Sequence, residues 1–386
     1  MPQPKRGVSF HDEKHNAHKP RRASKQDGEE FHETSGDWAE AATPDSNWGF
    51  DSEPPFWAKE ARTLANCGTL MNPDKFFVSQ NTGLKIHIRS YMKNTHNRHV
   101  FLFHGLNDHC NKYSYQCLAR ELEKSGCTVH GMDMQAHGHS QEFEVQYIGH
   151  WTELVDDAVQ WVQLVMKGKP DSHIFQFVSH GTGGAIALKL QEMLQDSTDE
   201  FGKLGERFRG HYAMAPLVTP AKINPITLCC LESLLCCFKD TFEMSTWLYP
   251  ARKLDKCPWE VYQTRKLYFT EARMDPLHWD SKTPCQTGKT LLDFAAHVRS
   301  MMHLISSPIK VAHGKEDGVA PISGSEDLVN CVAFGRGKKT DEMIWKLPDE
   351  KHVILSGNYG EELVEDICAW LTKYAKNKEH LANPVV

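Results

Sequence analysis

Residues 179–184 read Ser-His-Gly-Thr-Gly-Gly, and this stretch decides the fold class of the chain. The apolar run His173–Val178 precedes it, and the helical pattern Ala185–Leu190 follows it. The order of strand, tight glycine turn and helix is typical of the turn that carries a catalytic nucleophile at its apex. In such a turn the apex residue is a serine, whereas the apex here is Gly181. The pattern therefore predicts the turn without a side chain that attacks a substrate.

The composition of the 386-residue chain is that of an ordinary globular protein, with 40% hydrophobic and 24% charged residues. A net charge of −6 gives no reason to expect nucleic acid as a partner. Residues 1–20 are polar and lack the apolar core of a secretory signal, and no apolar run reaches the length of a membrane span. We therefore expect a cytoplasmic protein whose 12 cysteines are mostly reduced.

The first 60 residues differ in character from the rest of the chain. Residues 1–60 mix both signs of charge with few aliphatic side chains, so they cannot bury enough apolar surface to offset the entropy of ordering. We expect a disordered N-terminal arm. Its aromatic residues are candidates for anchoring the arm to the folded domain or to a protein partner: Trp38, Trp48, Phe50, Phe56 and Trp57.

From Lys75 onward, short apolar strands alternate with helical segments. The pattern predicts a hairpin over 76–88, strands at 100–103, 128–132, 174–178, 211–215, 309–312 and 343–347, and helices at 115–124, 151–166, 182–194, 325–331 and 361–374. Repeated strand–helix units imply an α/β fold with a mostly parallel sheet and helices on both faces. Residues 217–297 interrupt the alternation, and we interpret them as an irregular inserted lid within a domain spanning 72–377.

Polar segments follow several of the predicted strands, where an open α/β sheet binds its ligands. They are His104–His109, Asp133–Ser140, the turn at Gly181, Asp317 and His352. The chain order of turn, acid and histidine is the order of the catalytic residues in α/β-hydrolases.

These segments resemble the α/β-hydrolase superfamily, and within it the monoglyceride lipase and lysophospholipase branch, which is grouped with serine aminopeptidase-like hydrolases. His104–Tyr113 resembles the HG-x-x-E-H-x-x-x-Y segment of that branch, and Asp133–Ser140 its D-x-x-G-H-G-x-S segment, with Ala136 where glycine is usual. Asp275-Pro276-Leu277 resembles the D-P-L at the end of the lid. The acid and histidine segments match at Asp317 and His352. Five motifs in order imply the α/β-hydrolase fold.

The resemblance implies a role for each site residue. Asp317 would be the acid, His352 the base, and the backbone N–H groups of Leu106 and Thr182 the oxyanion hole, while the nucleophile position falls on Gly181. No cofactor is implied. Loss of the nucleophile in a comparable triad lowers kcat by about 10⁶-fold.

Three functional interpretations follow. The first is a monoglyceride-lipase-like pseudoenzyme of lipid metabolism that binds an acyl ester or lipid, or regulates another protein. The second is an active lipid esterase or lysophospholipase in which His352 activates water, or in which Ser179 or Thr182 attacks. The third is a non-enzymatic interaction scaffold that docks a partner through the N-terminal arm. A single-base difference between serine and glycine codons is a further possible origin of Gly181.

The predicted lid contains an apolar segment, Ile226–Phe238, with two adjacent cysteine pairs. It is too short to span a bilayer, so we expect either peripheral membrane contact, with palmitoylation as an option, or a helix packed over the pocket. The cysteine pairs do not have the usual zinc-ligand spacing. His137 and His139 have no third ligand at a suitable spacing, so we predict no metal site and expect them to shape the loop.

Overall fold

The computed structural model describes residues 75–91, 95–142, 147–196, 198–220, 275, 277, 283–332, 334 and 340–376. Contacts divide the chain into the units 1–44 and 45–386, and every described residue lies in the second. The predicted arm 1–60 and the apolar segment 226–238 therefore lie outside the described residues. Within the described part of the chain, no helix has the length and apolar character needed to cross a membrane.

Eight strands form one mixed sheet in the order β1-β2-β4-β3-β5-β6-β7-β8. The antiparallel hairpin of β1 and β2 forms one edge, and β2 also pairs antiparallel with β4. All the other pairs are parallel, so their carboxyl ends meet at one edge of the sheet. The strand bounds are β1 Lys75–Val78, β2 Lys85–Ser90, β3 Arg98–Phe103, β4 Cys127–Met132, β5 Ile174–His180, β6 Phe208–Met214, β7 Ile309–Gly314 and β8 Ile344–Leu347.

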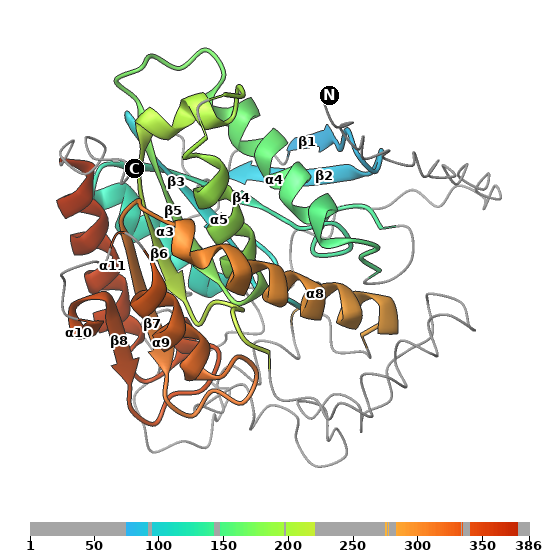
Figure 1. Ribbon diagram of the computed structural model, residues 1–386. Helices are drawn as coiled ribbons and strands as arrows, with labels where there is room; N and C mark the ends of the chain where they lie inside the picture. Colours follow the sequence, from blue (N-terminus) through green and yellow to red (C-terminus); the bar gives the residue numbers. More distant parts are fainter. Residues whose placement is uncertain are drawn as a thin grey trace, which may run out of the picture. The chain divides into compact units, whose positions relative to one another are not determined.

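Helices cover both faces of this sheet (Figure 1). Among the described residues, the α-helices are α3 Tyr113–Lys124, α4 Trp151–Met166, α5 Thr182–Met193, α8 Cys285–Met301, α9 Ile322–Cys331, α10 Thr340–Met343 and α11 Gly360–Ala375, and the 3-10 helices are η1 Gly202–Arg207, η5 Met302–Leu304 and η7 Ile354–Ser356.

Two apolar cores result from the alternation of side chains along the strands. Phe101 and Phe103 of β3 pack in the core that contains α4, α5 and α8, whereas Val100 and Leu102 pack in the core that contains α3 and α11. A strand buried on both faces reads as a continuous apolar run, which explains why the sequence pattern locates β3.

The predicted strands and helices outside the insertion are present, and their ends differ from the predicted ends by three residues or fewer. The description of residues 217–297 as irregular is wrong for residues 285–297, because they form most of α8. Phe294, Ala295 and Val298 of this helix lie in the main apolar core. Thr287 and Thr290 are also buried, and they bond to the backbone of residues 148 and 149. These buried polar side chains obscure the apolar periodicity by which a helix is recognised in sequence.

Candidate active site

The turn between β5 and α5 has the backbone of a sharp strand-to-helix elbow. Gly181 has φ 54° and ψ −119°, a conformation that L side chains rarely adopt and that glycine adopts without a steric penalty. Its N–H donates to the carbonyl of Met214 (3.2 Å), and its carbonyl accepts hydrogen bonds from Gly184 and Leu217. Strand β6 and the first turn of α5 therefore hold the elbow from both sides.

An acid and a histidine meet beside this elbow. Asp317 follows β7, His352 follows β8, and Asp317 Oδ2 lies 2.7 Å from His352 Nδ1. The Asp317 side chain is fully buried, whereas that of His352 remains 10% exposed. The second oxygen, Oδ1, accepts hydrogen bonds from the N–H groups of Val319 (2.7 Å) and Ala320 (2.9 Å). The carboxylate is thus fixed in one orientation with an oxygen directed at the imidazole.

The charge state of Asp317 follows from these contacts. Burial alone would raise its pKa, but the charge of His352 and the hydrogen bonds from His313 and His352 outweigh burial, so the pKa of Asp317 is lowered. The acid is therefore ionised at neutral pH and can stabilise a protonated His352.

The apex of the elbow faces His352. A Cβ atom built on Gly181 would lie 3.1 Å from His352 Nε2 and 3.6 Å from the Cα of Gly105. A side chain at this position would therefore begin next to the base, after a shift of a few tenths of an ångström. Leu106 follows Gly105 in the loop after β3. Thr182 is the first residue of α5, so its N–H is among those that have no acceptor within the helix.

His180 connects the elbow to the loop that carries His352. Its Nε2 lies 3.0 Å from the His352 carbonyl oxygen, and the two rings pack with centroids 4.7 Å apart. Burial, with the charge of His352 adding to it, lowers the pKa of His180 to about 3, so this ring is neutral at physiological pH. The sequence pattern alone predicts no role for His180. Its place next to the apex was the available signal.

His313 is a second imidazole on the acid. Its Nε2 lies 3.1 Å from Asp317 Oδ2 and 2.7 Å from the Ala320 carbonyl oxygen, while its Nδ1 lies 2.7 Å from the hydroxyl of Ser325. It is fully buried, four residues before the acid. Its position four residues before Asp317 is the signal in the sequence for this contact.

Ser179, one of the alternative nucleophiles, is engaged elsewhere. Its Oγ lies 2.6 Å from His211 Nε2, and His211 Nδ1 lies 3.2 Å from Gln191 Oε1. All three side chains are buried. The arrangement resembles a serine–histidine pair, but it lies between β5, β6 and α5, where an ester substrate has no access.

Two of the motifs that the sequence matched separately touch one another. His109 Nε2 lies 2.6 Å from Asp275 Oδ2, and the His109 Nδ1 accepts a hydrogen bond from the N–H of Asn111. Burial opposes protonation of His109, but the hydrogen bond and charge of Asp275 outweigh it and raise the pKa of His109. This hydrogen bond joins the loop after β3 to Asp275, which lies within the predicted insertion.

His137, in the loop after β4, bonds within its own loop. The ring of His137 is buried, and its Nδ1 lies 2.9 Å from the carbonyl oxygen of Gln135 in the same loop. Burial lowers the pKa of His137 to about 4. His137 therefore supports the turn of its own loop.

Known proteins share this organisation. Residues 94–341, more than half of the chain, match the family described as serine aminopeptidase, S33 (Hydrolase_4). A monoacylglycerol lipase of Mycolicibacterium smegmatis is 20% identical over 280 residues, which cover 71% of this chain and 88% of that protein.

Solved structures show the same fold. The monoacylglycerol lipase of Paleococcus ferrophilus is 19% identical with a TM-score of 0.58, and the match covers 75% of this chain and 99% of that chain. A soluble variant of the Saccharomyces cerevisiae monoglyceride lipase is 17% identical with a TM-score of 0.61, and the match covers 80% and 97%. The fold is that of the α/β-hydrolases, and the chain belongs to the serine aminopeptidase S33 family.

Proposed function

We propose that this protein binds acyl esters of the monoacylglycerol class and does not form an acyl-enzyme. The observation that supports the proposal is Gly181 at the apex of the elbow, with an imidazole nitrogen 3.1 Å from the position of its missing Cβ. The relative from S. cerevisiae was solved in complex with a substrate analogue, which supports the choice of ligand class. The predicted membrane contact through Ile226–Phe238 and the predicted partner of the arm 1–60 belong to this proposal.

In this proposal the ester carbonyl oxygen accepts hydrogen bonds from the backbone N–H groups of Leu106 and Thr182. Backbone donors do not depend on the identity of the side chain, and the N-terminus of α5 favours negative charge at this point. Asp317 holds His352 in the tautomer protonated on Nδ1. The acyl group is therefore polarised as in a hydrolase, but Gly181 places no hydroxyl at the apex of the elbow to attack it.

The 2.7 Å contact between Asp317 and His352 favours a second candidate, which is slow hydrolysis by water. His352 Nε2 would accept a proton from water as the water oxygen attacks the carbonyl carbon. The same proton would then pass to the leaving alcohol as the tetrahedral intermediate collapses. Products would be a fatty acid and glycerol, with no covalent intermediate.

Gly181→Ser tests the leading proposal. We expect the variant to react with a fluorophosphonate probe and to hydrolyse a monoacylglycerol at least about 10³-fold faster than the wild type, because only the nucleophile is missing. Gly181→Ala is the matched control: it adds the same Cβ without the hydroxyl and should show neither property. Failure of Gly181→Ser to gain activity while it remains folded would contradict the assigned acid, base and oxyanion groups.

Ligand binding is measured separately on the wild-type protein. An ether analogue of a monoacylglycerol, which has no bond to hydrolyse, should bind with a saturable heat signal in calorimetry. If the wild type also hydrolyses the ester, the activity should disappear in His352→Ala and remain in Ser179→Ala, because Ser179 bonds to His211 and does not face His352. Absence of binding to the ether analogue would contradict the proposal.

A further inference from the structure

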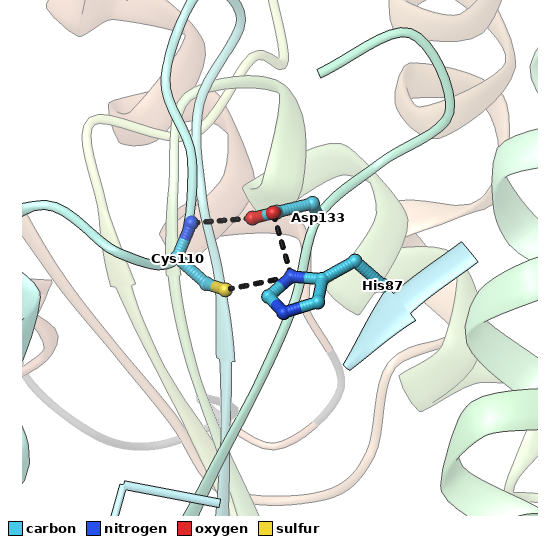
Figure 2. Close-up of side chains that lie close together, drawn as sticks. All are labelled: His87, Cys110 and Asp133. Atoms are coloured by element: carbon cyan, nitrogen blue, oxygen red, sulfur yellow. Dashed lines mark hydrogen bonds and ion pairs between the residues drawn. The ribbon is translucent and has the colours of Figure 1, made fainter. Parts of the chain in front are cut away.

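Three buried side chains from three separate segments, His87, Cys110 and Asp133, meet in the structure (Figure 2). His87 lies on β2, Cys110 in the loop after β3, and Asp133 directly after β4. Their imidazole, thiol and carboxylate donor atoms all lie within 4.8 Å of one another. A thiol, an imidazole and a carboxylate together are a set of ligands that suits a divalent transition metal.

We propose that His87, Cys110 and Asp133 bind a zinc ion. His87 Nδ1, Cys110 Sγ and Asp133 Oδ2 supply three donors, and the exposed imidazole of His139, whose ring packs edge-on against that of His87 with centroids 5.1 Å apart, supplies the fourth. In the sequence, His139 has no third ligand at the spacing of a usual metal motif. The fold brings His87 and Cys110 next to Asp133, from which they are 46 and 23 positions away in the sequence.

The distances within the cluster are close to those of a zinc site. The separation of Cys110 Sγ and His87 Nδ1 is 3.9 Å, and that of His87 Nδ1 and Asp133 Oδ2 is 2.8 Å. Around tetrahedral zinc, with bonds of about 2.0–2.3 Å, the corresponding separations are about 3.6 Å and 3.4 Å. Binding therefore requires His87 and Asp133 to move apart by about half an ångström, which a side-chain rotation provides.

Further contacts orient the carboxylate in the way that metal ligands are oriented. Asp133 Oδ1 accepts a hydrogen bond from the N–H of Cys110 (2.7 Å), and Oδ2 accepts one from the N–H of His139 (3.0 Å). The hydroxyl of Ser140 donates to the Asp133 carbonyl (2.7 Å). Such outer hydrogen bonds hold a ligating carboxylate in place. When zinc binds Oδ2, it would replace only the hydrogen bond from His87 Nδ1, and the hydrogen bonds from the backbone would remain.

The protons balance as follows. The Cys110 thiol loses its proton to solvent and becomes a thiolate, and His87 changes from the tautomer protonated on Nδ1 to the one protonated on Nε2. Asp133 already carries a negative charge. The thiolate and the carboxylate together neutralise Zn²⁺, so the occupied site has no net charge in a buried environment.

Metal analysis of the full-length protein tests the proposal. We expect about one equivalent of zinc in protein purified without chelator, and a thiolate-to-cobalt charge-transfer band after chelation and reloading with Co²⁺. Cys110→Ser should lose the band. Cys117→Ser is the matched control, because Cys117 is also a buried cysteine but lies on α3 outside the cluster, and it should retain the band.

Thermal unfolding provides a readout that does not depend on the cobalt charge-transfer band. Zinc should raise the midpoint of the chelated wild-type protein and of Cys117→Ser, but not that of Cys110→Ser, since a ligand that binds only the folded state stabilises it. An unchanged midpoint and the absence of the cobalt band in folded wild-type protein would overturn the proposal and leave the cluster as a hydrogen-bonded carboxylate. A band that persists in Cys110→Ser would assign the thiolate to another cysteine and would also overturn it.

Discussion

Several buried histidines in this protein hold neighbouring groups in place through hydrogen bonds that the residue type alone does not indicate. His180, His211 and His313 are all buried, yet they bond respectively to the base loop, to Ser179 and to the acid. A sequence pattern finds residues that occupy motif positions, such as Asp317 and His352. It does not find partners such as His87 and Cys110, because their proximity depends on strand order and loop conformation.

Asp157 is a buried acid with no part in the proposed site. Burial is the main cause that raises its pKa to about 7, and the charge of Glu153 adds to it. In the unfolded chain the Asp157 carboxyl has a pKa near 3.8. The free energy of unfolding therefore decreases as pH rises from about 4 to about 7, and it stays lower above pH 7. We expect Asp157→Asn to increase the free energy of unfolding by about 2–4 kcal/mol at pH 8 and by little at pH 4.

Urea unfolding of Asp157→Asn and wild type at the two pH values measures this effect. Asp171→Asn, at an exposed position, is the control and should follow the wild type at both pH values. An equal gain at pH 4 and pH 8 would show that the ionisation of Asp157 is not the cause.

At the scale of elements, α5 begins in contact with the backbone of β3. A Cβ atom built on Gly183 would lie 2.4 Å from the carbonyl oxygen of His104 and 2.6 Å from that of Phe103. These are backbone atoms, so they cannot move without displacing β3 or α5. We expect Gly183→Ala to lower the free energy of unfolding by about 2 kcal/mol or more.

Gly168→Ala provides the comparison for this variant. Gly168 lies in the turn after α4, with φ +70°, and a Cβ atom there meets nothing within 4 Å. It should therefore show only the cost of the left-handed backbone, about 1 kcal/mol. If denaturant titrations give equal losses for both variants, close packing of α5 on β3 is not the reason for a glycine at 183.

Most elements were predictable because their side chains repeat with the period of one secondary structure. Helix α4 is predicted with its observed bounds, since its buried residues follow a helical period along one face. Helix α8 was missed because polar threonines lie on its buried side. For the candidate site, the sequence pointed to Gly181, Asp317 and His352, which lie together in the structure and whose catalytic roles stay predictions. The contacts of His180 and His313 with these residues are long-range or buried and carry no local signal.

At the scale of the whole molecule, buried neutral histidines make the domain less stable in acid. Burial lowers the pKa of His99 to about 4 and those of His130, His180 and His211 to about 3. Below about pH 6.5 these rings bind protons in the unfolded chain, whereas in the folded protein they remain neutral. The free energy of unfolding is therefore highest above pH 6.5 and decreases progressively as pH falls toward 4.

His211→Gln tests this linkage at one ring, because burial alone lowers its pKa. Between pH 6 and pH 4, the slope of unfolding free energy against pH should decrease by about 1.4 kcal/mol per pH unit relative to wild type. Exposed His303→Gln is the matched control. Parallel pH profiles for His211→Gln and wild type would exclude His211 as a source of acid sensitivity.

Because of the backbone angles of Gly181, a side chain that restores activity at this position should also lower thermal stability. A residue with a Cβ atom held at φ 54° and ψ −119° carries about 1–3 kcal/mol of strain, which glycine avoids. Gly181→Ser and Gly181→Ala should therefore both unfold at a lower temperature than wild type, even where the serine variant gains hydrolysis. Improvement of that variant by directed evolution would then require stabilising substitutions elsewhere before further gains in rate. Calorimetric scans of the three proteins would give the size of this trade-off directly.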